Sequence, residues 1–427
     1  MIKTRVWMLR IFGLLAALWI VAISIRFAVA DDFAHPETDR VDAVERLAKA
    51  IRMRPTSADY LLWKAQIEMT GTTAGDDLVR ADFEKVLALD ARNSEALMNL
   101  GTLARRAGNS TKAEAYLLQA VELDRTFKPV WTLANHYFQT GQFDKMWPRI
   151  TQTLRIADPG LAGLAQFSPE PVFELCWQAG ATPQQILALM PQRTALLIGF
   201  FLNALGRKDL DAASLVFAKA LAVSDPSDMV ERNAFVGFCW GLLNAHRTRE
   251  AVEVWNTLID REMVKSTPLY PEKGNSLADP WLLEGPSPVT FGWATKAHPH
   301  VAISHGRGWV RAEFDGREDE RLELLTKNLP IMPDRSYTFR WKAGFEGEKQ
   351  VGTEESGLEV HFFSGDEVLP GRCPDLLGPG NMRECRFRAP ADSDLVRMVV
   401  LYRRPLGSRR FTGIVQLTGF ELELAGQ

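Results

Sequence analysis

The sequence predicts two structural classes in one chain: an all-α solenoid of helical hairpins, followed by an all-β sandwich. Two observations support this prediction. Large side chains recur every 34 residues in the first part, and hydrophobic residues alternate with polar ones from about residue 289 onwards. A repeat of about 34 residues is typical of stacked helical hairpins. A period of two is typical of strands that bury one face.

The composition is that of an ordinary globular protein. The 427 residues exceed what one hydrophobic core usually holds and suffice for two or three domains. The net charge of −3 gives no overall signal for nucleic acid, so we predict no nucleic-acid partner. Four cysteines are too few for a disulfide-rich scaffold.

Residues 1–30 are predicted to be a signal peptide or a transmembrane anchor. Basic residues precede an apolar run over 11–25, a pattern that inserts a segment into a membrane with its N-terminus in the cytoplasm. The length of the run favours an uncleaved membrane helix, whereas the small residues Ala28 and Ala30 leave cleavage near Ala30 open. In either case we expect the chain from Asp32 onwards to be periplasmic or extracellular.

Residues 38–264 have helical hydrophobic spacing and carry the repeats. Trp63, Leu97 and Trp131 stand 34 residues apart near the start of three successive copies. The copy that begins at Ser94 is the clearest, because small residues in it allow two helices to approach closely, while large residues fill the space between them. Its patterned positions are Leu97, Leu100, Gly101, Ala113, Leu117 and Ala120.

These positions resemble the tetratricopeptide repeat, closely so from Tyr60 to Pro159. After Pro159 prolines interrupt the pattern, which returns at Leu197, and we expect five or six repeats. The resemblance implies that Trp63 and Trp131 occupy a core position between repeats. It also implies that the first helices of the hairpins line a groove that binds a protein partner.

Asparagines on the predicted first helices are the candidate residues of this groove. They are Asn99, Asn135 and Asn203. Asparagine at such sites resembles the groove residues of repeats that hold a peptide backbone. An ordinary solvated surface is the alternative interpretation for each of them.

A change in composition separates the two halves of the chain. Prolines and glycines break any helix over 265–288, which we predict to be a linker that includes a first irregular strand. Over 289–427, seven or eight short strands with turn signals between them predict a two-sheet sandwich.

Several phrases in this half resemble galactose-binding-like jelly rolls, the fold of many non-catalytic carbohydrate-binding modules. They are 291–293, 309–316 and 333–343. The resemblance implies a jelly-roll sandwich in which a sugar stacks on aromatic rings. The candidate carbohydrate-binding residues are Trp293, Trp341 and Tyr402, and the sandwich core is the alternative location for these rings. The acidic residues that hold calcium in such modules are altered here, so we predict no metal.

The cysteines of the two halves differ in their predicted roles. Cys373 and Cys385 flank a loop rich in proline and glycine and predict a disulfide in an oxidising compartment. Cys176 and Cys239 lie in apolar helical surroundings and are expected to be buried and inert.

Two further clusters are most simply read as polar loops. A metal site and an anion site are the respective alternatives. The clusters are His298, His300 and His305, and Arg403, Arg404, Arg409 and Arg410.

The sequence contains no phosphate-binding loop, dinucleotide fingerprint, nucleophile elbow or zinc-protease motif. We therefore expect a non-enzymatic scaffold without a cofactor, exported or anchored to a membrane through its N-terminal helix. The repeats would bind a protein, and the sandwich would bind a glycan or cap the assembly. By analogy, such a protein suits exopolysaccharide or cell-envelope assembly. The alternatives are a polysaccharide-modifying enzyme with its site between the halves, and a purely structural scaffold.

Overall fold

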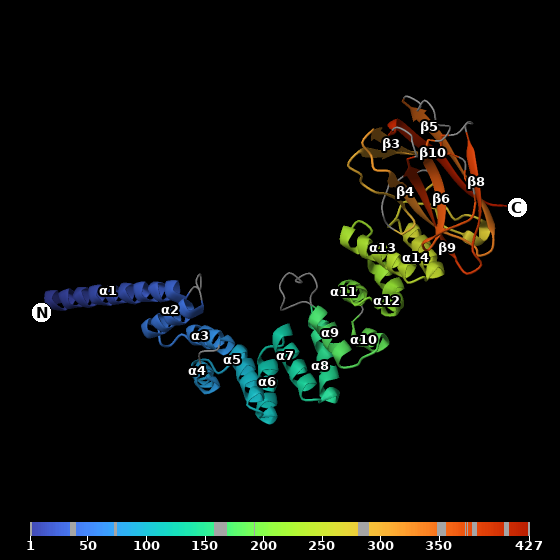
Figure 1. Ribbon diagram of the computed structural model, residues 1–427. Helices are drawn as coiled ribbons and strands as arrows, with labels where there is room; N and C mark the ends of the chain where they lie inside the picture. Colours follow the sequence, from blue (N-terminus) through green and yellow to red (C-terminus); the bar gives the residue numbers. More distant parts are fainter. Residues whose placement is uncertain are drawn as a thin grey trace. The chain divides into compact units, whose positions relative to one another are not determined.

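The computed structural model describes residues 2–34, 40–71, 75–157, 169–191, 193–280, 290–347, 356–371, 373, 375–377, 382–404 and 410–425. Within these residues, fourteen α-helices are followed by ten β-strands (Figure 1). The protein is therefore a multidomain chain with an all-α solenoid followed by an all-β sandwich, as the sequence predicts.

The chain divides into two compact units, residues 1–200 and 201–427. The boundary falls within one helix, α11 (Thr194–Gly206). The second unit therefore combines the end of α11 and the helices that follow it with the whole sandwich. The predicted linker of 265–288 falls inside this unit, and its residues from 281 onwards lie outside the described part of the chain.

Helices of the first unit pair in chain order into hairpins. The pairs are α1 (Ile2–Ala34) with α2 (Arg40–Met53), α3 (Ala58–Thr70) with α4 (Asp76–Leu89), α5 (Ser94–Arg106) with α6 (Ser110–Leu123), and α7 (Phe127–Gln139) with α8 (Phe143–Ile156). Two shorter helices follow, α9 (Glu170–Gln178) and α10 (Pro183–Leu189).

The sequence sets the ends of α5 and α6 locally. Asn93 caps α5 by accepting a hydrogen bond from the Ala96 N–H, and Asn109 caps α6 in the same way. Gly108 in the turn between them has φ +77°, which favours glycine. The two helices then approach so closely at Gly101 that an added Cβ would lie 2.8 Å from Cγ of Leu117.

Small buried residues show that the first helices do not keep a strict period. Ala65, Gly101 and Ala134 occupy the same buried position of α3, α5 and α7 and are 36 and 33 residues apart. On α7 the core position therefore belongs to Val130, which is fully buried. Trp131 is only half-buried, and Trp63 is 40% exposed. The expectation that both tryptophans pack between repeats is therefore wrong, because it assumed a constant spacing of 34.

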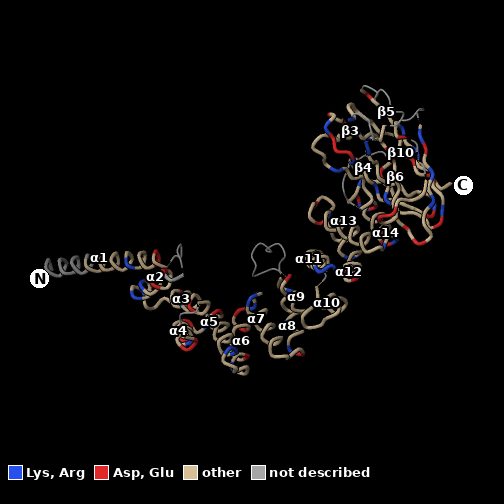
Figure 2. Tube along the Cα trace, in the orientation of Figure 1, with Lys and Arg blue, Asp and Glu red and all other residues tan. Residues whose placement is uncertain are grey.

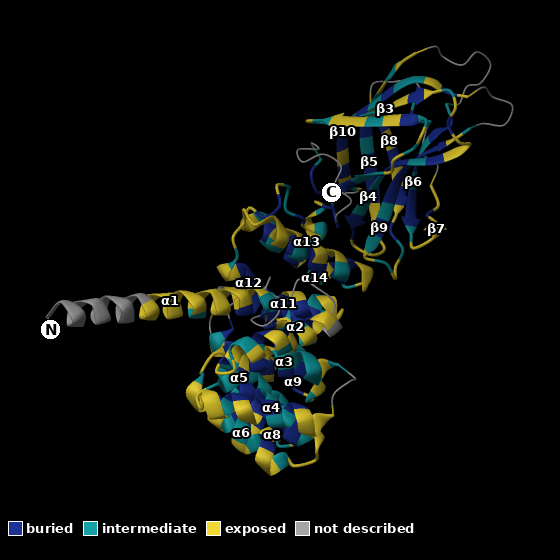
Figure 3. Ribbon diagram, turned by 90° about the vertical axis from the view of Figure 1, so that its left-hand side faces the viewer, coloured by how far each residue is buried: buried dark blue, intermediate teal, exposed yellow. Residues whose placement is uncertain are grey.

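The end of α1 packs on α2 and α3 through small residues. Ala30 and Ala34 are buried there together with Tyr60. By contrast, residues 15–22 of α1 are exposed (Figure 3). In the described part of the chain we find no helix with both the length and the apolar character that crossing a bilayer requires.

In the second unit, a cluster of phenylalanines joins the helices. These helices are α11, α12 (Leu210–Val223), α13 (Met229–Asn244) and α14 (Thr248–Asp260). The Phe201 ring packs on Phe235 at 4.8 Å between ring centres, and Phe217 packs on Phe238 at 5.4 Å. The buried rings therefore hold α11, α12 and α13 together.

The ten described strands form two antiparallel sheets of five strands each. In sheet order, the first contains β1 (Trp293–Thr295), β4 (Arg321–Pro330), β9 (Leu395–Arg403), β6 (Leu358–Ser364) and β7 (Glu367–Val368). The second contains β2 (Val301–Gly306), β3 (Trp309–Asp315), β10 (Thr412–Leu424), β5 (Ser336–Glu346) and β8 (Arg383–Arg388). Alternate side chains of both sheets fill one core, which gives the strands of Figure 3 their alternating colours.

The cysteines are paired and buried as the sequence predicts. Cys373 and Cys385 form a disulfide, with their Cα atoms 4.8 Å apart, and so fasten residue 373 to β8. Cys176 and Cys239 are free and buried. Burial raises the pKa of both thiols to about 12, so neither forms a reactive thiolate at neutral pH.

The last helical hairpin packs directly against the sandwich part of the second unit. The Trp255 ring of α14 meets Phe291 edge-on, with ring centres 5.7 Å apart. Asn256 bonds both backbone groups of Leu269, and Thr248 Oγ1 donates to Asp394 Oδ1 at 2.6 Å. Apolar and polar contacts therefore bind the hairpin to the strands as one packed body.

A lysine lies inside the sandwich. Lys327 on β4 is 1% exposed, its Nζ donates to the carbonyl of Ala278, and it lies 4.5 Å from the centre of the Trp293 ring. Burial lowers the pKa of Lys327 to about 7, although the Asp279 carboxylate opposes this change. The interior of the second unit therefore contains an amine that titrates near neutral pH.

Candidate protein-binding face

Each first helix of the repeats buries most of its surface and leaves one stripe uncovered. On α7 the side chains of Lys128, Trp131 and Asn135 are not buried, whereas Val130 and Ala134 beside them are. Spacings of three and four residues place the uncovered side chains on one side of the helix. Helix α7 thus presents a stripe with one amide and one indole.

The same kind of stripe runs along α5 and α3. On α5 it contains Glu95, Asn99 and Thr102, and on α3 it contains Asp59, Trp63 and Gln66. Hydrogen bonds hold the stripes side by side, since Glu95 accepts from both neighbouring helices. We call the combined surface the first-helix face, and it consists of Asp59, Trp63, Gln66, Glu95, Asn99, Thr102, Lys128, Trp131 and Asn135.

The bonds across this face also pair two of its charges. Gln66 Nε2 donates to one carboxylate oxygen of Glu95 at 3.1 Å, and Lys128 Nζ donates to the other at 2.5 Å. Burial alone would raise the pKa of Glu95, but the hydrogen bond and positive charge of Lys128, together with the bond from Gln66, lower the pKa below its usual value. The Glu95 carboxylate therefore stays charged at neutral pH and forms an ion pair with Lys128. Acidic and basic residues are also intermixed along these helices in Figure 2.

Two of the three predicted groove asparagines lie on the first-helix face. Asn99 is partly exposed, and Asn135 is too, although its Nδ2 donates to the carbonyl of Trp131 at 3.1 Å. Asn203 lies on α11 in the second unit and is 9% exposed. A binding role for these residues stays a prediction. The sequence-based prediction did not include Trp63 and Trp131 in the face. The positions of the small residues Ala65, Gly101 and Ala134 indicate that both tryptophans lie outside the core.

Part of this helical region matches a known protein family. A family model described as the tetratricopeptide repeat matches residues 80–126, which include α5 and α6. The chain therefore contains tetratricopeptide repeats. No curated protein matches the chain.

Several solved structures resemble the chain. The MamA protein is 19% identical, with 47% of this chain and 91% of that chain covered and a TM-score of 0.29. PilW, a type IV pilus biogenesis factor, is 16% identical, with 56% and 94% covered and a TM-score of 0.29. Yeast Tom70 is 19% identical, with 56% and 51% covered and a TM-score of 0.32.

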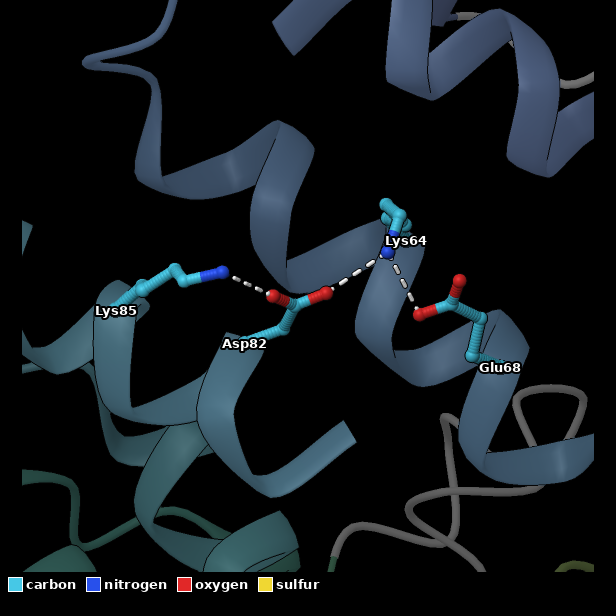
Figure 4. A network of polar contacts seen from close by, with 4 residues as sticks. All are labelled: Lys64, Glu68, Asp82 and Lys85. Carbon is cyan, nitrogen blue, oxygen red and sulfur yellow. Dashed lines mark hydrogen bonds and ion pairs between the residues drawn. The ribbon is translucent and has the colours of Figure 1, made fainter. Parts of the chain in front are cut away.

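A network of ion pairs fixes the first helix of the hairpin α3–α4 (Figure 4). Lys64 Nζ donates to Glu68 and to Asp82, at 2.8 Å in both cases, and Lys85 donates to the second oxygen of Asp82 at 2.8 Å. Asp82 is only 4% exposed. Burial would raise the pKa of Asp82, but the bonds from the two lysines outweigh it and lower the pKa. The charged network therefore positions α3 and, with it, the adjacent Trp63.

We expect Lys64→Met to destabilise the first unit by about 1–3 kcal/mol, because the buried Asp82 carboxylate loses a hydrogen-bonded cation. The double variant K64M/D82L should recover most of this loss, since an apolar pair can replace a buried ion pair at little cost. Urea unfolding followed by circular dichroism measures both effects. A double variant that is less stable than K64M would show that the network is not what holds the two helices together.

The predicted carbohydrate-binding residues lie inside the sandwich, which corrects that prediction. Trp293, Trp341 and Tyr402 are each 0% exposed and belong to the sandwich core. Trp293 Nε1 donates to the carbonyl of Asp279 at 2.7 Å, and the Tyr402 hydroxyl donates to buried Glu318 at 3.0 Å. A sugar needs an exposed aromatic face on which to stack, and none of these three rings offers one.

Two histidines of the predicted cluster form hydrogen bonds within the sandwich. His298 Nε2 bonds the carbonyl of Glu323 at 2.9 Å, and His300 Nδ1 bonds the Asp315 carboxylate at 3.1 Å. Across the described ranges, no group of three or more histidine, cysteine or acidic residues is placed to hold a metal ion. In the arginine cluster, Arg404 pairs with Glu320, while Arg409 lies outside the described residues.

Proposed function

We propose that this chain is a non-enzymatic scaffold whose tetratricopeptide repeats bind a segment of another protein on the first-helix face. The observation that supports the proposal is that two indole rings and the Asn99 amide lie uncovered on adjacent helices. Tryptophan is enriched in protein interfaces because its ring offers a large contact area at a low cost in conformational entropy. Asn99 adds a donor and an acceptor for a peptide backbone.

We also propose that the protein works outside the cytoplasm, in the assembly of the cell envelope or of an exopolysaccharide. The basic and apolar N-terminal segment supports export. The disulfide between Cys373 and Cys385 suits an oxidising compartment. For the sandwich, the contacts of Trp255, Asn256 and Thr248 favour a structural role that supports the repeats, over binding a glycan at the buried rings.

Affinity purification of the wild-type chain and of the Asn99→Arg variant, followed by mass spectrometry, tests the proposed function by comparing which proteins each chain recovers. The added guanidinium places a long, charged side chain in the middle of the face, so we expect recovery of a genuine partner to fall at least about tenfold. Gln119→Arg is the matched control, because Gln119 is an exposed residue of α6 that lies off the first-helix face. A set of proteins recovered equally by all three chains would contradict the proposal.

A further inference from the structure

We infer that the sandwich binds a phosphate group on the outer face of its first sheet, between Arg321 of β4 and Arg403 of β9. The ligand class is a phosphate monoester, carried by a small molecule or by a lipid head group. Arg403 belongs to the arginine cluster of the sequence, and the pairing of the two strands brings Arg321 beside it. This inference goes beyond the proposed function, because it does not depend on the first-helix face.

Arg321 and Arg403 stand directly opposite each other on neighbouring antiparallel strands. The Arg403 N–H points away from β4 and donates to the carbonyl of Gly357 at 2.7 Å, so no backbone hydrogen bonds join the two arginines. In such a pair the Cα atoms are about 4.5 Å apart and the side chains are at their closest. The next residues, Leu322 and Tyr402, are buried in the core, so both arginine side chains leave on the outer face.

Two like charges in this position oppose folding. Like charges directly opposite each other on neighbouring strands are destabilising. Within the described residues, neither of these guanidinium groups forms an ion pair. An oxyanion bound between them removes the repulsion, so the pair suits a ligand better than it suits the fold alone.

Two of the three acidic residues over 319–323 already have partners of their own. Glu320 pairs with Arg404, and Glu323 pairs with Arg397 at 3.7 Å. The third, Asp319, is exposed and stands before the start of β4. Its single negative charge does not balance two arginines, so a net positive charge is left for an anion.

The arginine pair is accessible from solvent. Both side chains are exposed, and the residue next to Arg403 on the side of β6 is Gly357, which has no side chain. The contact with the last helical hairpin lies at the other end of these strands, since Asp394 before β9 accepts the bond from Thr248. A ligand can therefore reach both guanidinium groups at once.

The charge and shape of the pair favour phosphate over carboxylate. A phosphate monoester carries a charge of about −1.5 to −2 at neutral pH and has three acceptor oxygens. It can accept hydrogen bonds from two guanidinium groups, whereas a single carboxylate is matched by one of them. Two more exposed arginines, Arg317 and Arg410, add positive charge to the segments that lead into β4 and β10.

Isothermal titration calorimetry of the full chain with glycerol 3-phosphate, at constant ionic strength, tests this inference. We expect one saturable site, and we expect Arg321→Gln and Arg403→Gln each to weaken binding at least about tenfold. Arg307→Gln is the matched control, because Arg307 is an exposed arginine in the turn between β2 and β3. Acetate supplies a carboxylate and should bind at least about tenfold more weakly than glycerol 3-phosphate.

Urea unfolding shows that the variants stay folded and gives a second readout. In phosphate-free buffer Arg321→Gln should be at least as stable as the wild type, because it removes the repulsion within the pair. Glycerol 3-phosphate should raise the unfolding midpoint of the wild type and leave that of Arg321→Gln unchanged. A ligand effect that is equal in both chains would contradict the assigned site.

A soluble short-chain phosphatidic acid distinguishes the two sources of the phosphate. Tighter binding of this lipid than of glycerol 3-phosphate identifies a lipid head group, and equal binding identifies a small phosphate ester. Only binding that Arg321→Gln removes counts here, because the exposed apolar side chains of α1 also attract acyl chains.

Three results would overturn the inference. The first is a loss of affinity in Arg307→Gln as large as that in Arg321→Gln, which would reduce the effect to general electrostatic attraction. The second is acetate binding as tightly as glycerol 3-phosphate, which would exclude selection of phosphate. The third is the absence of binding by both phosphate probes.

Discussion

Trp255→Ala will destabilise the second unit by about 3–5 kcal/mol, and α14 and β4 will lose their protection from hydrogen exchange together. Trp255 is 3% exposed, and its ring packs edge-on against Phe291, which belongs to the segment that leads into β1. Truncation leaves a cavity at the contact between the helical hairpin and the strands. Hydrogen exchange with mass spectrometry measures the protection of each element.

Trp255→Phe is the matched control for this variant. Trp255 Nε1 is buried, and no described residue accepts a hydrogen bond from it. Replacing the indole by a phenyl ring therefore sacrifices no bond within the described chain and should cost less than about 1.5 kcal/mol. Loss of protection confined to α14, with β4 unchanged in Trp255→Ala, would show that the hairpin and the sandwich are energetically independent.

The stability of the second unit should rise by about 3 kcal/mol between pH 7 and pH 9.5, and Lys327→Met should remove most of that rise. The pKa of Lys327 is lowered to about 7 in the folded protein, chiefly by burial, from an ordinary value of 10.5. Between these values the unfolded chain binds more protons than the folded one, so folding becomes more favourable as the pH rises. At pH 7, K327M should therefore be at least as stable as the wild type.

Urea unfolding at a series of pH values measures this effect through the fluorescence of the buried tryptophans. Lys342→Met is the matched control, because Lys342 lies on β5 with an exposed side chain. It should leave the wild-type pH profile unchanged. A profile for K327M that rises as steeply as that of the wild type would assign the pH dependence to another group.

The fold class could be predicted because the sequence has two clear periods. Large side chains repeat about every 34 residues in the helical half, and hydrophobic residues alternate with polar ones in the strands. The register of the repeats could not be predicted from the largest residues. Trp63 and Trp131 dominate the pattern, but Ala65, Gly101 and Ala134 decide which side of each helix is buried, because only a small side chain permits the close approach of two helices.

In the sandwich, the alternation of residues along one strand already indicates which of its rings are buried. Tyr337, Phe339 and Trp341 alternate with polar residues on one strand and so share a face, which is the buried one. That alternation places Trp341 in the core rather than at a sugar site. The burial of Lys327 has no such local signal, because it depends on the carbonyl of Ala278, 49 residues earlier in the chain.

The contacts of α14 with the strands also limit how this repeat array can change during evolution. Arrays of helical hairpins usually lengthen by duplication of a hairpin, and an uncovered terminal hairpin also allows copies to stack end to end. Here the last hairpin is packed against the sandwich half through contacts of Trp255, Asn256 and Thr248. New repeats are therefore tolerated only upstream of α13, and the array is closed to polymerisation at this end.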